Sequence, residues 1–460
     1  MQGGRAGCIV PFMNWTTPQD RLKQGQAMRK QVGRQKHNDL NPKARPANAL
    51  VLLERAAKGR VPKLIELKFQ LMAQSAFGYF RGAVPVMAAD LAALPNTGIF
   101  TQICGDAHVR NLGAFAAPDG RLVFDINDFD ETTHAPFEWD LKRMAASLIL
   151  AGRESGHKDA SARAAVEACV ARYAERMHAF AQMPILEVAR HQVHVEGEAV
   201  HDALLKAERS TQLHTLEQLT EPVDKRATAI EAARRFKVMK PMLARVTGKE
   251  AKEVLKGLGP YRRMLEPQRV HLLSLYRAID VAFKVVGTGS VGLRDYCIYF
   301  EGNGPGDPLF LQIKEETESG YAPYLPDARP ARHNGQRAVE GQKSMQVQSD
   351  PFLGWTEIAG RQYLVRQLCD HKGSIDLVDL AGKGLTAYAQ VCGELLARGH
   401  ARSGDALIIA GYLGSGEGFA NALTDFGVRY ADQTAKDWED LKKKQGQRDK
   451  GKRSKGKTAR

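Results

Sequence analysis

The sequence has no run of apolar residues long enough to form a membrane-spanning helix. Residues 1–15 lack the sustained apolar core of a secretory signal. Cysteine is scarce: six are scattered along 460 residues, and no two form a CxxC pair. We therefore expect a cytoplasmic protein with reduced thiols. Cys104 lies beside an acidic stretch and is either a nucleophile or a buried residue that packs in a strand; we favour the buried residue.

Aromatic residues are absent from residues 441–460, which contain ten Lys or Arg and one Asp. This tail carries +9 of the net charge of +14, and we expect it to be disordered. It either makes weak contact with polyanions or only keeps the protein soluble, and it offers no platform for stacking bases. The rest of the chain is long enough for two or three lobes with substantial cores.

Residues 103–143 hold two groups of charged residues on two short apolar stretches. The turn signal Pro118-Asp119-Gly120 lies between them and predicts a hairpin with a returning strand at 121–124. Such a hairpin brings carboxylates together, and these repel one another unless a cation or a proton lies between them. Carboxylate and amide oxygens are ligands for Mg²⁺. The residues concerned are Asp106, Asn111, Asp125, Asp128, Asp130 and Glu131, whereas Asp119 is interpreted as solvated.

The pattern Asp-x-His-x-x-Asn, then a hairpin and an apolar strand ending in Asp, resembles the catalytic core of aminoglycoside phosphotransferases and other protein-kinase-like enzymes. The resemblance implies that Asp106, in a catalytic motif with His108 and Asn111, orients or deprotonates the acceptor hydroxyl. Asn111 and Asp125, fourteen residues apart, would hold Mg²⁺, with Asp128 as second ligand or support. Asp140 would tie down the catalytic loop.

The same stretch, with FRG at 80–82 and MAADLAALP at 87–95, more closely resembles an uncharacterised bacterial family, domain of unknown function 2252. This resemblance covers nearly the whole chain, and the family name implies no activity. Arg81 in FRG either contacts a phosphate, caps a helix or pairs with an acidic residue.

Residues 278–316 alternate apolar and polar residues between glycine-rich turns, which predicts an antiparallel sheet. A strand, a glycine loop and a second strand resemble the phosphate-covering loop of protein kinases, in which glycine lets backbone amides approach phosphates. The next strand ends in Lys314, where kinases place the lysine for the α- and β-phosphates. Glu340 is the candidate ion-pair partner of Lys314, with Glu315 and Glu316 as competitors. The loop residues are Gly287, Thr288, Gly289, Ser290 and Gly292.

The remaining segments are predicted mainly as helices, and three nearby histidines are interpreted as solvated rather than metal-binding. Strands are expected at 352–356 and 362–368. The histidines are His191, His194 and His201; the expected helices are 47–57, 63–79, 137–153, a helix-rich region 158–258 that includes 198–218 and 225–245, then 335–348, 384–400 and 418–440.

The predicted fold class is α+β: a protein-kinase-like, two-lobed fold with a helical catalytic lobe and a small antiparallel-sheet nucleotide lobe. GDAHVRN precedes GTGSVG by about 180 residues, so the resemblance implies a circular permutation. The expected divisions are a basic extension at 1–60, the catalytic lobe at 61–260 and 376–440, the nucleotide lobe at 261–375, and the tail at 441–460.

Three functions are compatible with these residues. The favoured one is an ATP- and Mg²⁺-dependent phosphotransferase with an unidentified acceptor, with nucleotidyl transfer as a variant of the same site. The second is a metal-dependent phosphoesterase that uses the carboxylates alone. The third is a module that binds a nucleotide without turnover.

Overall fold

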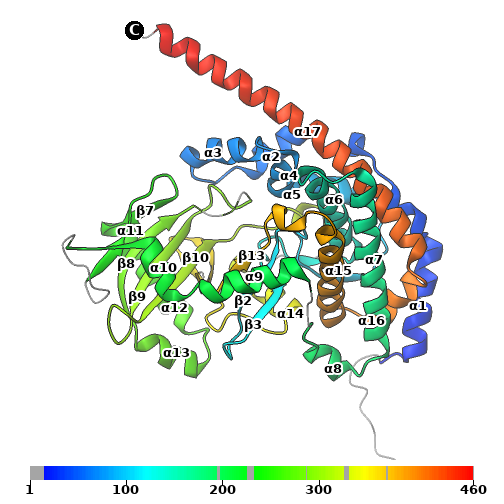
Figure 1. Cartoon of the computed structure of the whole chain (residues 1–460), viewed down its shortest axis with the longest axis horizontal. Helices are drawn as coiled ribbons and strands as arrows, with labels where there is room; N and C mark the ends of the chain where they lie inside the picture. Colours follow the sequence, from blue (N-terminus) through cyan, green and yellow to red (C-terminus); the bar gives the residue numbers. More distant parts are fainter. Residues whose placement is uncertain are drawn as a thin grey trace, which may run out of the picture.

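A computed structural model of the chain describes residues 15–193, 197–224, 233–285, 287, 289–325, 331–368 and 371–458. Helices gather on one side of the molecule and a twisted antiparallel sheet on the other (Figure 1). The chain is thus a mixed α+β protein. We call the two parts the helical lobe and the sheet lobe, and each has hydrophobic clusters of its own.

Helices α6 (Glu138–Glu154) and α15 (Gly384–Ser403) form the centre of the helical lobe. Residues on every side of α6 are buried, as expected of a helix inside a core. Helix α7 (Asp159–Gln182) crosses α15 so closely that a β-carbon at Gly393 would lie 2.1 Å from the Cys169 carbonyl oxygen. The other helices here are α1 (Pro18–Gln31), α2 (Ala49–Ala56), α3 (Pro62–Met72), α4 (Ala76–Gly82), α5 (Val84–Ala92), α8 (Ile185–Arg190), α9 (Glu198–Arg209), α16 (Ala406–Leu413) and α17 (Glu417–Thr458).

The predicted central hairpin is confirmed: β2 (Leu112–Ala116) pairs antiparallel with β3 (Leu122–Ile126). Gly120 in its turn has φ +83°, a left-handed conformation that favours glycine. The short strand β13 (Gly373–Ser374) extends this pair. Strands β1 (Phe100–Ile103) and β4 (Thr133–Pro136) pair with each other on either side of the hairpin in sequence.

The sheet lobe contains a 6-stranded sheet in the order β11-β12-β10-β9-β8-β7. Every residue of β9 is buried because both faces of the sheet are covered: Tyr296 and Ile298 face one cluster, and Cys297 and Tyr299 face another. The bounds are β7 (Leu243–Val246), β8 (Arg277–Lys284), β9 (Asp295–Glu301), β10 (Pro308–Glu315), β11 (Gly354–Ile358), β12 (Arg361–Gln367), α10 (Gln212–Leu219), α11 (Gly248–Lys256), α12 (Leu258–Arg262), α13 (Pro267–Ser274) and α14 (Asn334–Met345).

The helix predicted for 225–245 is wrong for its described part. Residues 225–232 lie outside the described residues, and the next element is β6 (Arg234–Phe236), which pairs with β5 (Thr220–Pro222) and precedes β7. Pro241 cannot continue a helix, and β7 completes the sheet by pairing with β8. The sheet lobe therefore begins before residue 260. The predicted helix 63–79 is also two helices, because Ser75 caps the start of α4.

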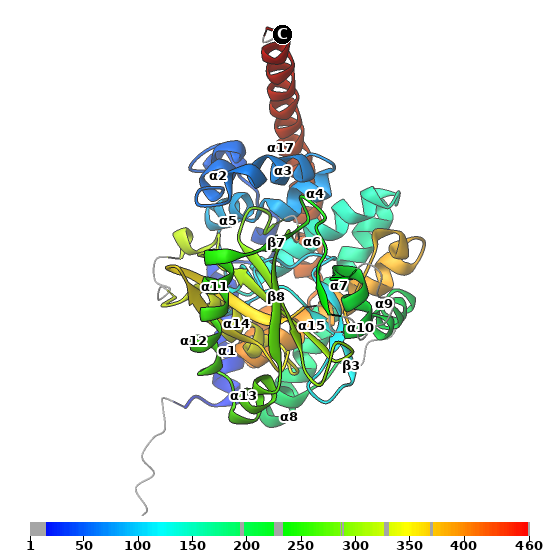
Figure 2. The ribbon, with the colours of Figure 1, turned by 90° about the vertical axis from the view of Figure 1, so that its left-hand side faces the viewer.

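Residues 441–458, expected to be disordered, continue helix α17, which projects from the helical lobe (Figures 1 and 2). The helix is already established where Phe419, Leu423 and Leu441 are buried, and Lys, Arg and Gln are good helix formers that extend it at little cost. Among the described helices, none combines the length and apolar character needed to cross a membrane.

Candidate functional site

Lys314, near the end of β10, crosses from the sheet lobe to the loop between β3 and β4. Its ammonium nitrogen lies 3.2 Å from an Asp128 carboxylate oxygen and 2.5 Å from one of Asp130. The Lys314 side chain is 3% exposed, whereas those of Asp128 and Asp130 are 47% and 23% exposed. Segments 103–143 and 280–316, far apart in the sequence, therefore meet here, with Asp128 and Asp130 as the carboxylates.

The charges of these three side chains depend on one another. Burial lowers the pKa of Lys314, but the carboxylates of Asp128 and Asp130 outweigh it and raise that pKa above its usual value. Burial and the neighbouring Asp128 raise the pKa of Asp130 to about 7. Burial opposes the ionisation of Asp128, yet Lys314 holds its pKa well below the usual range. Lys314 thus keeps Asp128 ionised, whereas Asp130 takes up a proton near neutral pH.

We call the loop between β3 and β4, which carries Asp128 and Asp130, the acidic loop. Helix α14 supports this loop through Arg337 rather than through Glu340. Arg337 donates to the carbonyl oxygens of Thr132 (2.6 Å) and Asp130 (2.7 Å). Glu340 is exposed and accepts a hydrogen bond from Gln336, so the prediction that it pairs with Lys314 is wrong.

The two competitors of Glu340 lie on different sides of β10. Glu315 pairs with Arg294 and Arg361, away from Lys314. Glu316 is buried, and its pKa is raised, first by burial and then by Asp130. Neither makes an ion pair with Lys314 in the described structure.

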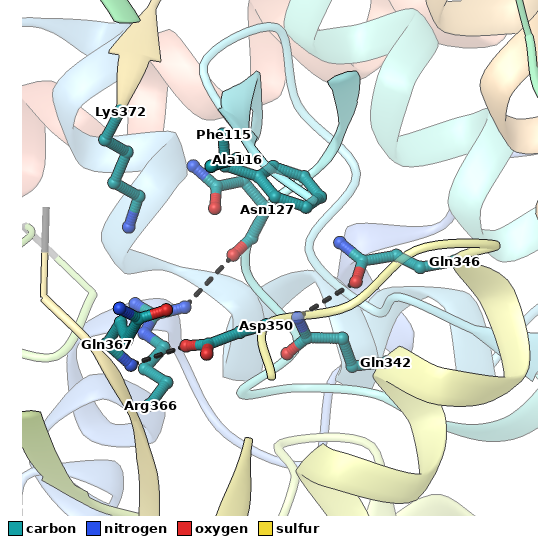
Figure 3. Close-up of a pocket in the computed structure, with 9 residues that line it drawn as sticks. All are labelled: Phe115, Ala116, Asn127, Gln342, Gln346, Asp350, Arg366, Gln367 and Lys372. Atoms are coloured by element: carbon teal, nitrogen blue, oxygen red, sulfur yellow. Dashed lines mark hydrogen bonds between the residues drawn. The ribbon is translucent and has the colours of Figure 1, made fainter. Parts of the chain in front are cut away.

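A pocket lies beside Asp128, between the hairpin and the sheet lobe (Figure 3). Arg366 reaches into it from β12 and donates to the Asn127 carbonyl oxygen (3.2 Å) and to Gln312 (2.9 Å). Burial lowers the pKa of Arg366, but Asp128 and Asp130 raise it overall. Two further charged side chains, polar amides, an alanine and one aromatic ring complete the lining; these are Asp350, Lys372, Asn127, Gln342, Gln346, Gln367, Ala116 and Phe115.

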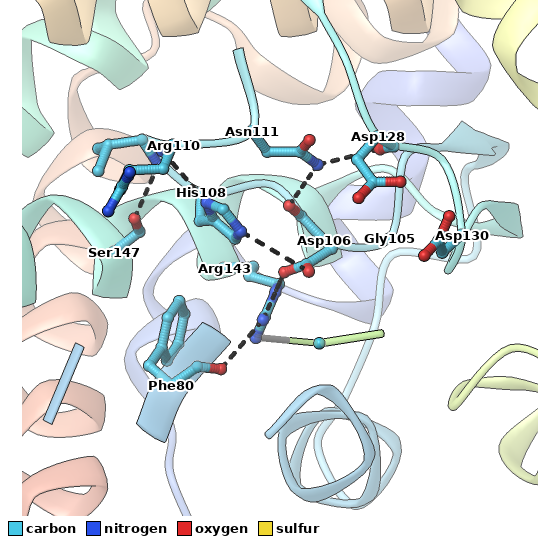
Figure 4. A network of polar contacts seen from close by, with 12 residues as sticks. Phe80, Gly105, Asp106, His108, Arg110, Asn111, Asp128, Asp130, Arg143 and Ser147 are labelled. Carbon is cyan, nitrogen blue, oxygen red and sulfur yellow. Dashed lines mark hydrogen bonds and ion pairs between the residues drawn. The ribbon is translucent and has the colours of Figure 1, made fainter. Parts of the chain in front are cut away.

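Asp106 lies in the loop between β1 and β2, beside Asp128 (Figure 4). Arg143 on α6 holds its carboxylate through contacts of 2.6 Å from Nε and 2.5 Å from Nη2. Arg143 is fully buried and stacks over Phe80, whereas the Asp106 side chain remains 20% exposed. Burial raises the pKa of Asp106 to about 6, Arg143 opposes the rise, and Glu131 and Asp128 add to it.

His108 and Asn111 support Asp106 from its own loop. The Nδ1 atom of His108 accepts from the Arg110 backbone amide (3.1 Å), so in the neutral ring Nε2 carries the hydrogen and lies 3.7 Å from Asp106. Burial, and then Arg81 and Arg143, lower the pKa of His108 and favour that neutral ring. Asn111 donates both amide hydrogens, to the carbonyl oxygens of Asp106 (2.9 Å) and Asp128 (3.0 Å). It thereby joins the two acidic loops and leaves its amide oxygen for another partner.

The predicted role of Asp140 in fixing the loop is confirmed. Its carboxylate accepts from the backbone amides of Cys104 (2.8 Å) and Gly105 (2.9 Å). Gly105 has φ +79°, and a β-carbon there would lie 2.2 Å from the Glu131 carbonyl oxygen. Only glycine therefore allows the two acidic loops to pack this closely.

Asp125, the predicted metal ligand, is not part of the cluster. It is 1% exposed and forms an ion pair of 2.5 Å with Arg398 on α15, which is fully buried. Asp125 lies within β3, and its side chain points toward α15, whereas Asp128 lies in the loop after the strand. The carboxylate available to a cation is therefore Asp128, which was expected only as second ligand or support.

The glycine loop between β8 and β9 packs against α3 and the residues just before it. Lys68 donates to the Gly289 carbonyl oxygen (2.7 Å), and Arg60 donates to that of Val291 (2.6 Å). A β-carbon at Gly289 would lie 3.7 Å from the Arg81 carbonyl oxygen, so the loop packs against the end of α4. Gly287 and Gly292 have φ values of +59° and +93° and, with Ser290, complete the described loop; Thr288 lies outside the described residues.

Cys104 is buried, and burial and Asp140 raise the pKa of its thiol well above the usual value, so it is packing rather than a nucleophile. His191 contacts Arg176 and Phe180, and His194 lies outside the described residues. Among the residues described, no three His, Cys, Asp or Glu side chains are grouped so that they could hold a metal ion by themselves.

Sequence reasoning missed three residues that shape the site, and it named Asp130 among the carboxylates without giving it a role of its own. Arg143 was visible in WDLKR, three residues after Asp140. Arg337 and Arg366 had no signal, because each acts through a contact with a segment about 200 residues away.

Comparisons with known proteins agree with the resemblance in the sequence. A family model described as "Uncharacterized protein conserved in bacteria (DUF2252)" matches residues 60–444. No curated protein and no solved structure matches the chain. The matched segment contains the acidic loops, the glycine loop and Lys314. The chain therefore belongs to the family of uncharacterized bacterial proteins called domain of unknown function 2252.

Proposed function

We propose that the protein is an ATP- and Mg²⁺-dependent phosphotransferase with a kinase-like, circularly permuted arrangement of its site. The observation that carries the proposal is the position of Lys314: its buried ammonium contacts Asp128 and Asp130 in a loop that Asn111 joins to Asp106. A cation, two carboxylates and a separate carboxylate supply what phosphoryl transfer needs, namely positioning and charge neutralisation.

The acidic loop suits Mg²⁺. Asp128 and Asp130 present partly exposed carboxylate oxygens side by side. Burial, and then repulsion from Asp128, raise the pKa of Asp130, and a bound cation would relieve that repulsion. Two carboxylates, with phosphate oxygens and water as the remaining ligands, are how proteins usually hold this ion. Asn111 could add its amide oxygen. When bound, Mg²⁺ would neutralise charge that develops on the phosphates.

The chain's own residues then have distinct roles. Lys314 binds the α- and β-phosphates, the 287–292 loop covers them, and Asp106 accepts the proton of the acceptor hydroxyl. The acceptor oxygen forms a bond to the γ-phosphorus, the bond from that phosphorus to the β,γ-bridging oxygen breaks, and ADP leaves. Arg143 and His108 hold Asp106 in position. The pocket beside Arg366, with its amides and Phe115, is the proposed place for the rest of the nucleotide.

Loss of γ-phosphate from labelled ATP tests the proposal, with Mg²⁺ present or removed by chelation. Wild type should turn ATP over only with Mg²⁺, and Asp106→Asn should keep ATP affinity while losing rate, because the carboxylate acts mainly in the transition state. Nucleotide binding without turnover would instead indicate a binding module. Stabilisation by Mg²⁺ alone, without any effect of ATP, would favour the phosphoesterase.

A further inference from the structure

Arg81 is a cation at the end of α4, beside the proposed site. Its Nε atom is buried without a hydrogen-bond partner among the described residues. Phe80, directly before it, accepts a hydrogen bond from Arg143, the residue that pairs with Asp106. Arg81 is therefore next to the loop that holds Asp106. Arg143 and Arg398 each pair with a carboxylate, whereas Nε of Arg81 has no hydrogen-bond partner among the described residues.

Arg110 is a second cation near Asp106, on the side where His108 lies. Figure 4 shows Arg110 and His108 on one side of Asp106, and Asp128 and Asp130 on the other. The guanidinium of Arg110 is 37% exposed, and its ion pair with Asp376 is long, at 3.9 Å.

Helix α4 brings Arg81 to the His108 side of Asp106, because the Phe77 ring on α4 lies edge-on to the His108 ring, with centroids 6.2 Å apart. Burial and the like charge of Arg110 lower the pKa of Arg81, while Asp106 and Asp128 oppose that fall. The main influences on the pKa of Lys314 besides its burial are, by contrast, Asp128, Asp130, Glu316 and Arg366. Lys314 thus contacts Asp128 and Asp130, whereas Arg110 follows His108 in the Asp106 loop and Arg81 follows Phe80, which accepts from the Arg143 that holds Asp106.

From this arrangement we infer that Arg81 and Arg110 form an anion-binding subsite beside Asp106, which takes an acceptor that carries a phosphate or carboxylate group in addition to its hydroxyl. The inference rests on the proposed function, in which Lys314 holds the donor and Asp106 faces the acceptor. A guanidinium beside a carboxylate base binds an anionic group in a fixed geometry and so positions the neighbouring hydroxyl.

Thermal-shift titrations of the full chain with inorganic phosphate, and separately with acetate, test the subsite at constant ionic strength. Phosphate or acetate should stabilise wild type, and the more effective anion indicates which group the acceptor carries. Arg81→Gln should weaken this binding by about tenfold or more, as expected for the loss of a charge-assisted hydrogen bond. Arg81→Lys should recover part of it, and the exposed control Arg263→Gln should match wild type. An unchanged response in Arg81→Gln would overturn the inference.

Repeating the titration with Mg·ADP bound separates this inference from the proposed function. For an acceptor subsite, the anion still binds to the ADP-loaded protein, and Arg81→Gln leaves ADP affinity unchanged. If ADP abolishes the anion response and Arg81→Gln weakens ADP binding, Arg81 serves the donor and the acceptor assignment is wrong. If ADP does not bind but the anion response still depends on Arg81, the anion site stands and the proposed function fails.

Discussion

Asp125 and Asp128 stand three residues apart, each beside a cation, yet their surroundings differ completely. Asp125 and Arg398 are 1% and 0% exposed and form a sealed pair between β3 and α15. Lys314 is equally buried, but its partner Asp128 is 47% exposed at the surface of the loop. A sealed pair can only stabilise the fold, whereas an open pair can exchange its partner for a ligand. Burial rather than residue type therefore separates the structural pair from the pair to which we assign the proposed function.

Replacing each cation by methionine should give the largest difference between the two pairs. Arg398→Met leaves the carboxylate of Asp125 buried and unpaired, which should lower the free energy of unfolding by about 3–5 kcal/mol. Lys314→Met should cost clearly less, because water can reach Asp128 and Asp130. Urea unfolding of both variants measures the difference. Equal losses would mean that the Lys314 pair is as structural as the Arg398 pair.

Asp128→Asn should affect ligands rather than stability. It removes a charged ligand of a hard cation, so Mg²⁺-dependent nucleotide binding should weaken by about tenfold or more. Calorimetric titration with Mg·ADP measures this loss. The matched control is Asp119→Asn, an exposed turn carboxylate that contacts Arg121, and it should bind as wild type does. Comparable losses in both variants would argue against a ligand role for Asp128.

The transfer rate should fall as the pH drops through about 6, where Asp106 becomes protonated. A base must be ionised to accept a proton, so the rate rises with pH through that pKa. Arg143→Met removes the cation that opposes this rise in pKa and should move the inflection to higher pH. Rate profiles of the two proteins measure the shift. An inflection that Arg143→Met leaves in place would argue against Asp106 as the base.

Glu340→Gln should have the smallest effect. Glu340 is exposed, contacts Gln336 and leaves Lys314 to the acidic loop, so neither Mg·ADP affinity nor turnover should change. Asp130→Asn, which alters an actual partner of Lys314, is the positive control. A loss in Glu340→Gln that equals the loss in Asp130→Asn would restore Glu340 as the partner of Lys314 in the working state.

Local chemistry made part of this architecture predictable. A Pro-Asp-Gly turn between two apolar stretches is enough to predict the β2–β3 hairpin, and alternation is enough for β8 to β10. Asp140 was assigned through the resemblance to phosphotransferases, since its partners Cys104 and Gly105 lie 36 and 35 residues earlier in the chain.

Long-range contacts decided what could not be predicted. The spacing from Asn111 favoured Asp125, but its facing was set by Arg398, which is 273 residues away in the chain. Asp128 and Asp130 took the place expected for Glu340 for the same reason, since they lie 186 and 184 residues before Lys314 in the chain. The strands at 234–246 were hidden because their stability comes from pairing with distant residues such as those of β8.

The affinity of Mg·ADP for wild type and for Lys314→Met, compared by calorimetric titration, tests the central claim most directly. The account predicts that wild type binds only with Mg²⁺ present, and that Lys314→Met binds about tenfold more weakly or worse, because a charged contact to phosphate is lost. Its urea unfolding should show that it is still folded. Equal affinities in the two folded proteins would contradict the claim that Lys314 and the acidic loop form a phosphate-donor site.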